Sequence, residues 1–467
     1  MVRRSISVIL PIVCLCLAAL ARAESNLDVL HIWLKAFNGG DAAALRDFQQ
    51  RYVGNSDIAF VNDTREETGG FDLVRIQTDT PTELSALLRQ RNYPSIWKVT
   101  MTRRAANTLP FANFSYLPEP VSQSKALAAL SAFADRLAAA NEFSGVIAVA
   151  QHGEQVFAKA WGLADRAKKR SVTVDTPFLV ASQGKMFTAV AALQLIECGR
   201  LSLDAPVGKY LTDYPNTEVA REVTVRELLT HTDGLGDMHF LQHVGVTKSR
   251  QEILAENRAA IHSIDDIIKL NGARPPAFKP GSKFEYNNYG YIVLGAIIQK
   301  VSGQSYYDYV ATHVFQPAGM THTGYPLRQR MEGVAVPYSR FDSSTLHSVL
   351  AELPWRGTPA GGGVSTAGDM IRFVAALSGG KLLSRAMLAQ AVRNETGRPH
   401  GWYGYGFITS QVGNFPYWGH GGGAPGQSVV LDYYPLTDTT FVCMSNRDPP
   451  VCDRLAFNFL FRLRTTH

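Results

Sequence analysis

The sequence predicts an α+β fold: an antiparallel sheet flanked by helices, with a helical subdomain beside it and a small α+β domain before it. Three observations support this fold class. Segments with strand character lie at both ends of the region 122–467. The stretch between them, roughly 183–330, has mostly helical patterning with Gly and Pro turns. The segment 108–121 contains three prolines and little periodicity, which is typical of a linker. We therefore expect one sheet assembled from both ends of the larger domain.

Residues 1–23 have the pattern of a secretory signal peptide. Arg3 and Arg4 give a basic start, an apolar run follows, and Ala21-Arg-Ala23 fits the small-x-small rule for cleavage. The apolar run is about 15 residues long, which is short of the about 20 that a membrane-spanning helix needs. We expect cleavage near Ala23, export to the bacterial periplasm or the outside of the cell, and no stable membrane span.

The composition argues against nucleic acid as a partner. The chain is 46% hydrophobic and 18% charged, an ordinary balance for a globular protein. Its formal net charge is +6, and the predicted signal peptide contributes Arg3, Arg4 and Arg22 to that charge but no acidic residue. The excess is too small to indicate a nucleic-acid or membrane-surface partner.

Three cysteines remain after the predicted cleavage: Cys198, Cys443 and Cys452. No Cys-x-x-Cys pair typical of a metal site is present. A Cys443–Cys452 disulfide suits an exported protein, but the spacing alone does not establish it. A domain of this size can bury enough core without a disulfide.

The region 24–107 is predicted to be a small α+β domain. The expected elements are helices near 27–37 and 42–51, strands at 71–77 and 97–102, and a helical stretch near 82–89. Asp41 is placed to cap the second helix. Helices followed by strands are similar to cystatin-like or nuclear-transport-factor-like domains. No catalytic cluster is visible there, which favours an accessory or binding domain.

The larger domain, 122–467, is predicted to contain seven regular elements at its two ends. They are helices at 122–140 and 453–463 and strands at 143–150, 155–161, 404–411, 428–434 and 439–445. The tetrapeptide Gln151-His-Gly-Glu154 between the first two strands is a hairpin signal.

Ser182-Gln-Gly-Lys185 is the strongest candidate for catalytic chemistry. A serine hydroxyl is a weak nucleophile until a base removes its proton. A lysine three residues later on a helix lies one turn away and can act as that base when burial keeps it neutral. The residues after Lys185 are strongly apolar. Ser182 follows the strand-like Phe178-Leu-Val180 and is expected at a helix N-terminus, where free N–H groups can hold an oxyanion.

Three other Ser-x-x-Lys stretches occur, at 95–98, 122–125 and 378–381. The first has strand character, the second begins a helix with its lysine on a face that is usually solvated, and the third is a Gly-Gly turn. In none of these stretches is the lysine expected to be buried, so Ser182 is preferred.

Two further motifs carry polar groups suited to the same site. Tyr286-Asn-Asn288 brings a phenol whose pKa a nearby lysine can lower, and an amide that can donate and accept hydrogen bonds. His420-Gly-Gly422 lies in a glycine-rich stretch that precedes a strand and allows close backbone approach. Gly423 could supply a second oxyanion N–H. Taken singly, Tyr286 would more often be a packing residue and the glycines a turn.

These three motifs, in this order, resemble the serine β-lactamase and penicillin-binding superfamily. The most similar branch is that of class C-like β-lactamase-related serine hydrolases, which includes esterases and D-stereospecific peptidases. The stretches 228–235, 361–370 and 403–407 also look like that branch. The resemblance covers about 122–465 and implies a β-lactamase/transpeptidase-like fold.

The resemblance also implies a role for each site residue. Ser182 is the acylated nucleophile, and Lys185 and Tyr286 are the general base and acid. Asn288 and Gly422 position the substrate. His420 is a catalytic residue that replaces the lysine usual in β-lactamases, as is common in esterase-like members. The backbone N–H groups of Ser182 and Gly423 form the oxyanion hole. His231 corresponds to a structural position that packs or caps.

Two departures bear on the substrate. Gly184 stands where Ser or Thr is common, and Gly421 lacks a hydroxyl that can hold a substrate carboxylate. No His-Glu-x-x-His spacing and no phosphate-binding glycine loop occur, so we expect neither metal nor cofactor. The predicted function is an exported serine hydrolase acting on an ester or amide in a small molecule or peptide. The alternatives are a β-lactamase or DD-peptidase, and a non-catalytic binding or sensor protein.

Overall fold

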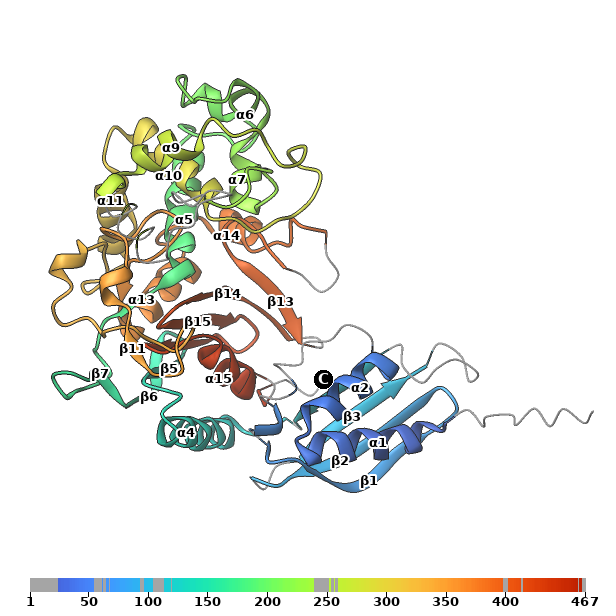
Figure 1. Cartoon of the computed structure of the whole chain (residues 1–467). Helices are drawn as coiled ribbons and strands as arrows, with labels where there is room; N and C mark the ends of the chain where they lie inside the picture. The colour runs from blue at the N-terminus through green and yellow to red at the C-terminus, as the bar shows by residue number, and fades with distance from the viewer. Residues whose placement is uncertain are drawn as a thin grey trace, which may run out of the picture. The chain divides into compact units, whose positions relative to one another are not determined.

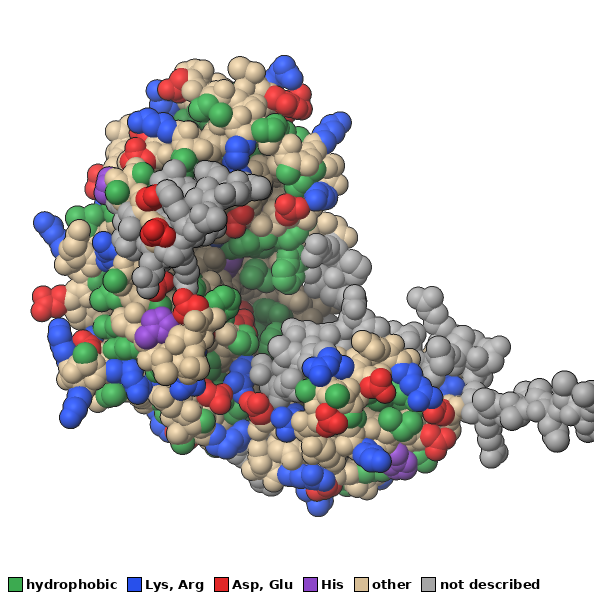
Figure 2. All heavy atoms as spheres, in the orientation of Figure 1, with side chains coloured by type: hydrophobic (Ala, Val, Ile, Leu, Met, Phe, Trp, Pro, Cys, Tyr) green, Lys and Arg blue, Asp and Glu red, His purple; other side chains and the backbone are tan. Residues whose placement is uncertain are grey.

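The computed structural model describes residues 24–463 apart from 54–60, 62–63, 67, 93–95, 104–112, 119, 239–251, 253–255, 257–258, 398–401, 413–414 and 461. The predicted signal peptide, 1–23, lies outside the described residues. The chain divides into two compact units, Met1–Glu119 and Pro120–His467. Within the described ranges, no helix is both long and apolar enough to cross a membrane. On the face seen in Figure 2, basic and acidic side chains of the described residues are interspersed.

The smaller unit packs two helices on a four-stranded antiparallel sheet (Figure 1). Its elements are α1 (Asn26–Gly39), α2 (Ala42–Tyr52), β1 (Phe71–Asp79), β2 (Glu83–Gln90), β3 (Ile96–Thr102) and β4 (Asn113–Pro118), with the strands in the order β1-β2-β3-β4. Asp41 caps α2 as expected, since its side chain accepts a hydrogen bond from Ala43 N. Trp33, Phe37 and Phe71 are buried between helices and sheet.

Two segments of this unit differ from the prediction. The stretch near 82–89 is strand β2, not helix, and pairs with both β1 and β3. Leu84, Ala86 and Leu88 are fully buried at every second position, which is the periodicity of a strand. The predicted linker 108–121 contains strand β4, which pairs with β3 from Asn113↔Thr102 to Pro118↔Trp97. Prolines at 110, 118 and 120 flank this strand and do not interrupt its interior.

The larger unit contains a six-stranded antiparallel sheet with the order β13-β14-β15-β16-β5-β6. The strands are β5 (Gly145–Gln151), β6 (Glu154–Trp161), β13 (Ile408–Val412), β14 (Phe415–Ala424), β15 (Gln427–Tyr434) and β16 (Thr439–Ser445). β16 pairs with β5, so the sheet joins the two ends of this unit, as predicted. β14 was not predicted as a strand, because its glycines indicated a turn.

Helices cover both faces of this sheet. α4 (Gln123–Ala139) and α15 (Val451–Leu460) pack against each other and against the sheet on one face. The disulfide Cys443–Cys452 joins β16 to α15, while Cys198 is a free, exposed thiol. α13 (Ala367–Ser378) and the short helix η1 (Ala181–Gln183) contact the sheet as well.

The helical subdomain surrounds α5 (Gly184–Glu197), whose residues are buried from Gly184 through Leu193. Figure 1 shows α5 running from the sheet into this subdomain. The other helices are α6 (Thr217–Glu222), α7 (Val225–Thr230), α9 (Ile264–Asn271), α10 (Tyr289–Ser302), α11 (Tyr306–Val310), α12 (Gln316–Ala318) and α14 (Arg385–Ala391). Short two-stranded ladders complete the unit: β7 (Leu163–Asp165) with β8 (Arg170–Ser171), β9 (Phe178–Leu179) with β12 (Val364–Ser365), and β10 (Tyr338–Ser339) with β11 (His347–Ser348).

Candidate active site

Ser182 and Lys185 lie where strand β9 turns into helix α5. Ser182 is in η1, and Lys185 is in the first turn of α5, with Nζ 3.4 Å from Ser182 Oγ. The backbone N–H of Ser182 has no hydrogen-bond acceptor among the described residues. Ser182 is half-buried, and Lys185 is fully buried. Ser182 therefore lies at the start of an apolar helix, with the buried Lys185 one turn away, which is the placement that the sequence predicted.

The hydrogen bonds of Lys185 leave one position on its Nζ facing Ser182. Nζ donates to Asn288 Oδ1 at 2.7 Å and to Ala360 O at 2.8 Å. Both partners are carbonyl oxygens, which only accept hydrogen bonds. They take two N–H bonds of the amine, so its remaining position faces Ser182 Oγ. In a neutral amine this position is a lone pair, which is able to accept a proton from the hydroxyl.

Burial lowers the pKa of Lys185 to about 7, although the negative charge of Asp237 acts in the opposite direction. The amine is therefore substantially neutral at pH 7 and can act as a base. Its Nζ also lies 4.7 Å from the ring centroid of Tyr286 and 5.6 Å from that of Tyr291. The ammonium formed after proton transfer is thus close to aromatic faces that stabilise it.

Tyr286 lies at this site, but its pKa moves in the direction opposite to the prediction. Burial raises the pKa of its phenol above the ordinary value, and a hydrogen bond with Ser182 offsets only part of that effect. The side chain as a whole remains 39% exposed. A phenol with a raised pKa keeps its proton at neutral pH, so Tyr286 is suited to donate a proton rather than to remove one.

The segment that carries Tyr286 and Asn288 is held by two acidic residues. Asp233 is buried and accepts hydrogen bonds from Asn287 Nδ2 at 3.1 Å on each carboxylate oxygen. Burial raises the pKa of Asp233 to about 7. Asp237 is exposed and accepts from the backbone N–H of Asn288 at 3.0 Å. These bonds hold the segment in the position from which Asn288 Oδ1 contacts Lys185 Nζ.

His231 packs beneath Tyr286 and caps a helix, which are the roles expected of it. It is the left-handed C-cap of α7 and is fully buried. Its ring centroid lies 4.2 Å from that of Tyr286 and 4.6 Å from that of Tyr403. Burial holds the pKa of His231 well below its usual range, with further lowering by Lys185 and His420. The ring is therefore neutral and supports the aromatic cluster.

His420 lies on β14 with both ring nitrogens occupied. Nδ1 is beside Gly421 O, and because a carbonyl only accepts, Nδ1 carries the ring hydrogen. Nε2 then accepts from the hydroxyl of Tyr403 at 3.0 Å. Burial, followed by the charge of Lys185, lowers the pKa of His420 to about 3. His420 is a neutral, locked side chain, in contrast to the cationic lysine that it replaces.

Glycines allow three backbone segments to meet at Ser182. A Cβ atom at Gly422 would lie 2.8 Å from Ser182 N and 3.0 Å from Ala181 Cβ. A Cβ atom at Gly184 would lie 2.9 Å from the Cα of Gly361, which explains the absence of Ser or Thr there. A Cβ atom at Gly421 would meet atoms only at 3.7 Å. The missing hydroxyl at Gly421 is therefore not imposed by lack of space.

Gly423 lies on a part of β14 that has only one strand partner. β13 pairs with β14 only as far as Gly419, whereas β15 pairs with it through Ala424. Among the described strands, none covers the other edge of β14 from His420 to Ala424. Such an edge can offer backbone groups to a substrate.

The competing motifs have structural roles in the described residues. Lys98, Lys125 and Lys381 are all exposed, and Ser95 lies outside the described residues. In the competing Tyr-x-Asn, Tyr214 is buried with its hydroxyl 3.0 Å from that of Tyr289, and Asn216 caps α6. Among the Ser-x-x-Lys motifs whose residues the structure describes in full, the Ser182 motif alone combines a half-buried serine with a buried lysine.

Sequence reasoning missed Ala360, Asp237 and Tyr403 as parts of the site. Ala360 contributes only its carbonyl oxygen, which no side-chain pattern reveals. Asp237 and Tyr403 act through Asn288 and His420, residues that are distant in the sequence. Tyr403 lies in the stretch 403–407, which carries part of the family resemblance. That resemblance was the one sequence feature that could have indicated a role for Tyr403 at the site.

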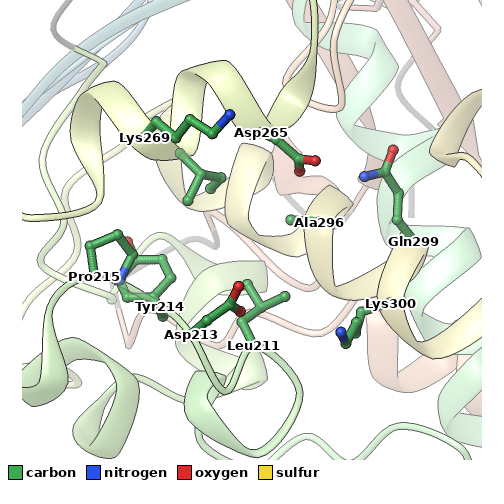
Figure 3. Close-up of a pocket in the computed structure, with 10 residues that line it drawn as sticks. Leu211, Asp213, Tyr214, Pro215, Asp265, Lys269, Ala296, Gln299 and Lys300 are labelled. Atoms are coloured by element: carbon green, nitrogen blue, oxygen red, sulfur yellow. The ribbon is translucent and has the colours of Figure 1, made fainter.

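A separate hollow lies in the helical subdomain (Figure 3). Its volume is about 440 Å³. Charged side chains of both signs line it, among them Asp213, Asp265, Lys269 and Lys300. None of the predicted catalytic residues lines this hollow.

Known proteins are similar to this chain over much of its length. The family profile described as Beta-lactamase matches residues 130–461. PbpX of Bacillus subtilis, to which a role as a penicillin-binding protein is ascribed, is 33% identical over 305 residues, covering 65% of this chain and 71% of PbpX. Esterase EstB of Burkholderia gladioli is 30% identical over 314 residues, covering 61% of this chain and 79% of EstB.

A solved structure with the same fold is that of a penicillin binding protein from Bacillus halodurans. It is 29% identical, has a TM-score of 0.61, and the match covers 69% of this chain and 97% of that one. The structure of EstCE1, titled a hydrolase with promiscuous acyltransferase activity, is 21% identical with a TM-score of 0.60. Its match covers 73% of this chain and 99% of that chain, and it shows the fold alone.

Proposed function

Because this chain belongs to the beta-lactamase family and is a serine hydrolase of that family, we propose that it cleaves an ester or amide through an acyl-enzyme on Ser182. The observation that carries this proposal is the environment of Lys185. A fully buried amine, with a pKa lowered to about 7, donates to two carbonyl oxygens and faces Ser182 Oγ at 3.4 Å. This is the arrangement that activates a serine.

The proposed reaction has two stages. Lys185 takes the hydroxyl proton as Ser182 Oγ attacks the carbonyl carbon, and the backbone N–H groups of Ser182 and Gly423 bind the resulting oxyanion. Tyr286 donates its proton to the leaving oxygen or nitrogen as the bond to that atom breaks, and the phenolate regains a proton from the Lys185 ammonium. Water then attacks the acyl-enzyme by the reverse route, releasing the acid and restoring Ser182.

The other site residues take positioning roles in this proposal. Asn288 holds the amine of Lys185 through its Oδ1 and can turn its amide toward a substrate. Gly422 keeps β14 close to Ser182. His420 was expected to be catalytic, but its two nitrogens are engaged by protein atoms, so we assign it to hold β14 and Tyr403 in place.

The charge of the site favours a substrate without a carboxylate beside the scissile bond. His420 is neutral at the position where a β-lactamase has a lysine, and Gly421 offers no hydroxyl. Asp237, next to Asn288, adds negative charge. An ester is therefore preferred over a penicillin or a D-alanyl peptide, both of which carry a carboxylate.

The alternative, a β-lactamase or DD-peptidase, is supported by the penicillin-binding protein names of PbpX and of the Bacillus halodurans structure. A substrate panel separates the two proposals. The full chain, with Ser182→Ala as control, is assayed with p-nitrophenyl esters, D-phenylalanine amide and nitrocefin. We expect the esters to have the highest kcat/KM, by at least about tenfold. Faster turnover of nitrocefin would favour the alternative, and no turnover of any substrate would favour a non-catalytic binding protein.

We also propose that the chain is exported to the periplasm or the outside of the cell after removal of residues 1–23. The disulfide between Cys443 and Cys452 supports an oxidising compartment. The unit that contains α1 and α2 is proposed to be an accessory or binding domain. Mass measurement of the protein secreted by its host would test the cleavage, with Glu24 as the expected first residue.

A further inference from the structure

Three side chains with metal-binding atoms meet on the segment that contains β10, β11 and the short helix after them. Asp342, His347 and Glu352 each bring one ligand atom, and these atoms all lie within 4.8 Å of one another. His347 Nε2 and Asp342 Oδ1 are 3.5 Å apart. Two ligands about 2.1 Å from a tetrahedral ion lie about 3.4 Å apart. This pair therefore already has the spacing found across such an ion.

The orientation of the His347 ring supports a cation at this position. Its Nδ1 lies 3.2 Å from Thr345 O, and because a carbonyl only accepts, Nδ1 carries the hydrogen. The lone pair of Nε2 in the neutral ring then faces the carboxylate of Asp342. A cation between these two atoms would bind both. Metal-binding histidines commonly make this kind of bond through the other ring nitrogen.

The backbone holds the three side chains together independently of an ion. His347 is paired with Ser339 in the β10–β11 ladder. Glu352 ends the short helix η5 (Leu350–Glu352), and Arg328 Nη1 donates to the carbonyls on either side of it, each at 2.9 Å. The ligands remain accessible, since the side chains of His347 and Asp342 are 36% and 40% exposed. A cation would thus bind a site that is largely preformed.

We propose that Asp342, His347 and Glu352 bind one divalent cation, and that Zn²⁺ is the cation that fits best. Imidazole with carboxylates is a typical zinc ligand set, whereas Ca²⁺ and Mg²⁺ prefer oxygen ligands only. Two carboxylates balance the charge of the ion, and water completes the tetrahedron. The ion links the β10–β11 hairpin to η5. This site is separate from Ser182 and does not depend on the proposed hydrolysis.

The test is zinc binding by the full, untagged chain. The protein is stripped with EDTA and dialysed against micromolar Zn²⁺, and the bound metal is measured by elemental analysis. Thermal unfolding with and without Zn²⁺ is recorded in parallel. We expect one saturable zinc per chain, and a higher Tm with zinc, since a ligand that binds only the folded state stabilises it. The variants His347→Gln and Asp342→Asn should each lower the affinity at least about tenfold.

His152→Gln is the matched control. His152 Nδ1 lies 3.2 Å from Asp438 Oδ2, so this exposed pair offers one histidine and one carboxylate without belonging to such a three-residue group in the described residues. We expect His152→Gln to bind zinc like the wild type. The Tm of each variant in EDTA reports its folding. Absence of saturable binding by the wild type, equal binding by the His347→Gln variant, or binding of Ca²⁺ in preference to Zn²⁺ would each overturn the proposal.

Discussion

Lys185 Nζ lies 2.7 Å from Asn288 Oδ1, and this contact joins α5, which begins two residues after Ser182, to the start of α10. Asn288 is a neutral acceptor, so it orients the amine without adding a charge that would favour the ammonium form. Burial lowers the pKa of Lys185, and a neutral residue at position 288 does not oppose that effect. Four predictions follow from the neighbourhood of this pair.

The rate of acylation should rise with pH through about 7. Burial lowers the pKa of Lys185 to about 7, so below this pH the ammonium cannot accept the Ser182 proton, and above it the neutral amine can. The raised pKa of Tyr286 keeps the proton donor intact over the same range. The measurement is kcat/KM for an ester between pH 5 and 9. A flat profile, or a rate that falls through pH 7, would contradict the assignment of Lys185 as base.

Replacing Asn288 by Asp should move that rising limb to higher pH. A carboxylate in hydrogen-bond contact with Lys185 Nζ favours its charged form and raises the pKa by about 1–3 units. Activity at pH 7 should therefore fall and recover at higher pH. Asn288→Ala is the comparison, because it removes the contact without adding charge. If the two variants lose activity equally at every pH, Asn288 positions substrate rather than Lys185.

The change Tyr286→Phe should lower kcat by about 10²–10⁴-fold, since it removes the proton donor of the leaving group. The aromatic ring remains, so its packing on His231 should keep the Tm close to that of wild type. An ester with a good leaving group needs less protonation and should lose less activity than an amide. Tyr433→Phe, which removes a hydroxyl that donates to Asp438, serves as a control with unchanged kcat.

Gly422 and Gly421 are neighbours on β14, and substituting each by Ala compares a crowded position with an open one. Gly422→Ala would place a Cβ atom 2.8 Å from Ser182 N, whereas Gly421→Ala meets atoms only at 3.7 Å. The first change displaces β14, and with it the Gly423 N–H, from Ser182 and should lower kcat by about 10²–10³-fold. The second should leave kcat within about threefold. Equal activity of the two variants would show that the approach of β14 to Ser182 does not matter for catalysis.

Patterns local in sequence allowed much of the fold and the nucleophile to be predicted. The apolar run after Lys185 predicted a buried helix, and α5 is that helix. Strand-like segments at both ends of the larger unit predicted a shared sheet, and β16 pairs with β5. In both cases the residues that decide the structure are adjacent or periodic in the chain.

The errors arose where tertiary contacts override local signals. The stretch 83–90 has helix-forming residues, but pairing on both sides makes it the strand β2. The glycines of β14 indicated a turn, yet they lie in a strand, and at Gly422 a larger residue would collide with Ser182. The locking of His420 by Tyr403 and the raised pKa of Tyr286 depend on burial, which sequence spacing does not report.

The most direct test of the central claim is the mass of the intact protein after exposure to a fluorophosphonate, with peptide mapping of the adduct. We predict one adduct per chain on Ser182, formed faster as pH rises through about 7, and none on Ser182→Ala. Labelling of the folded Ser182→Ala variant, or no labelling of the folded wild type, would contradict Ser182 as the nucleophile.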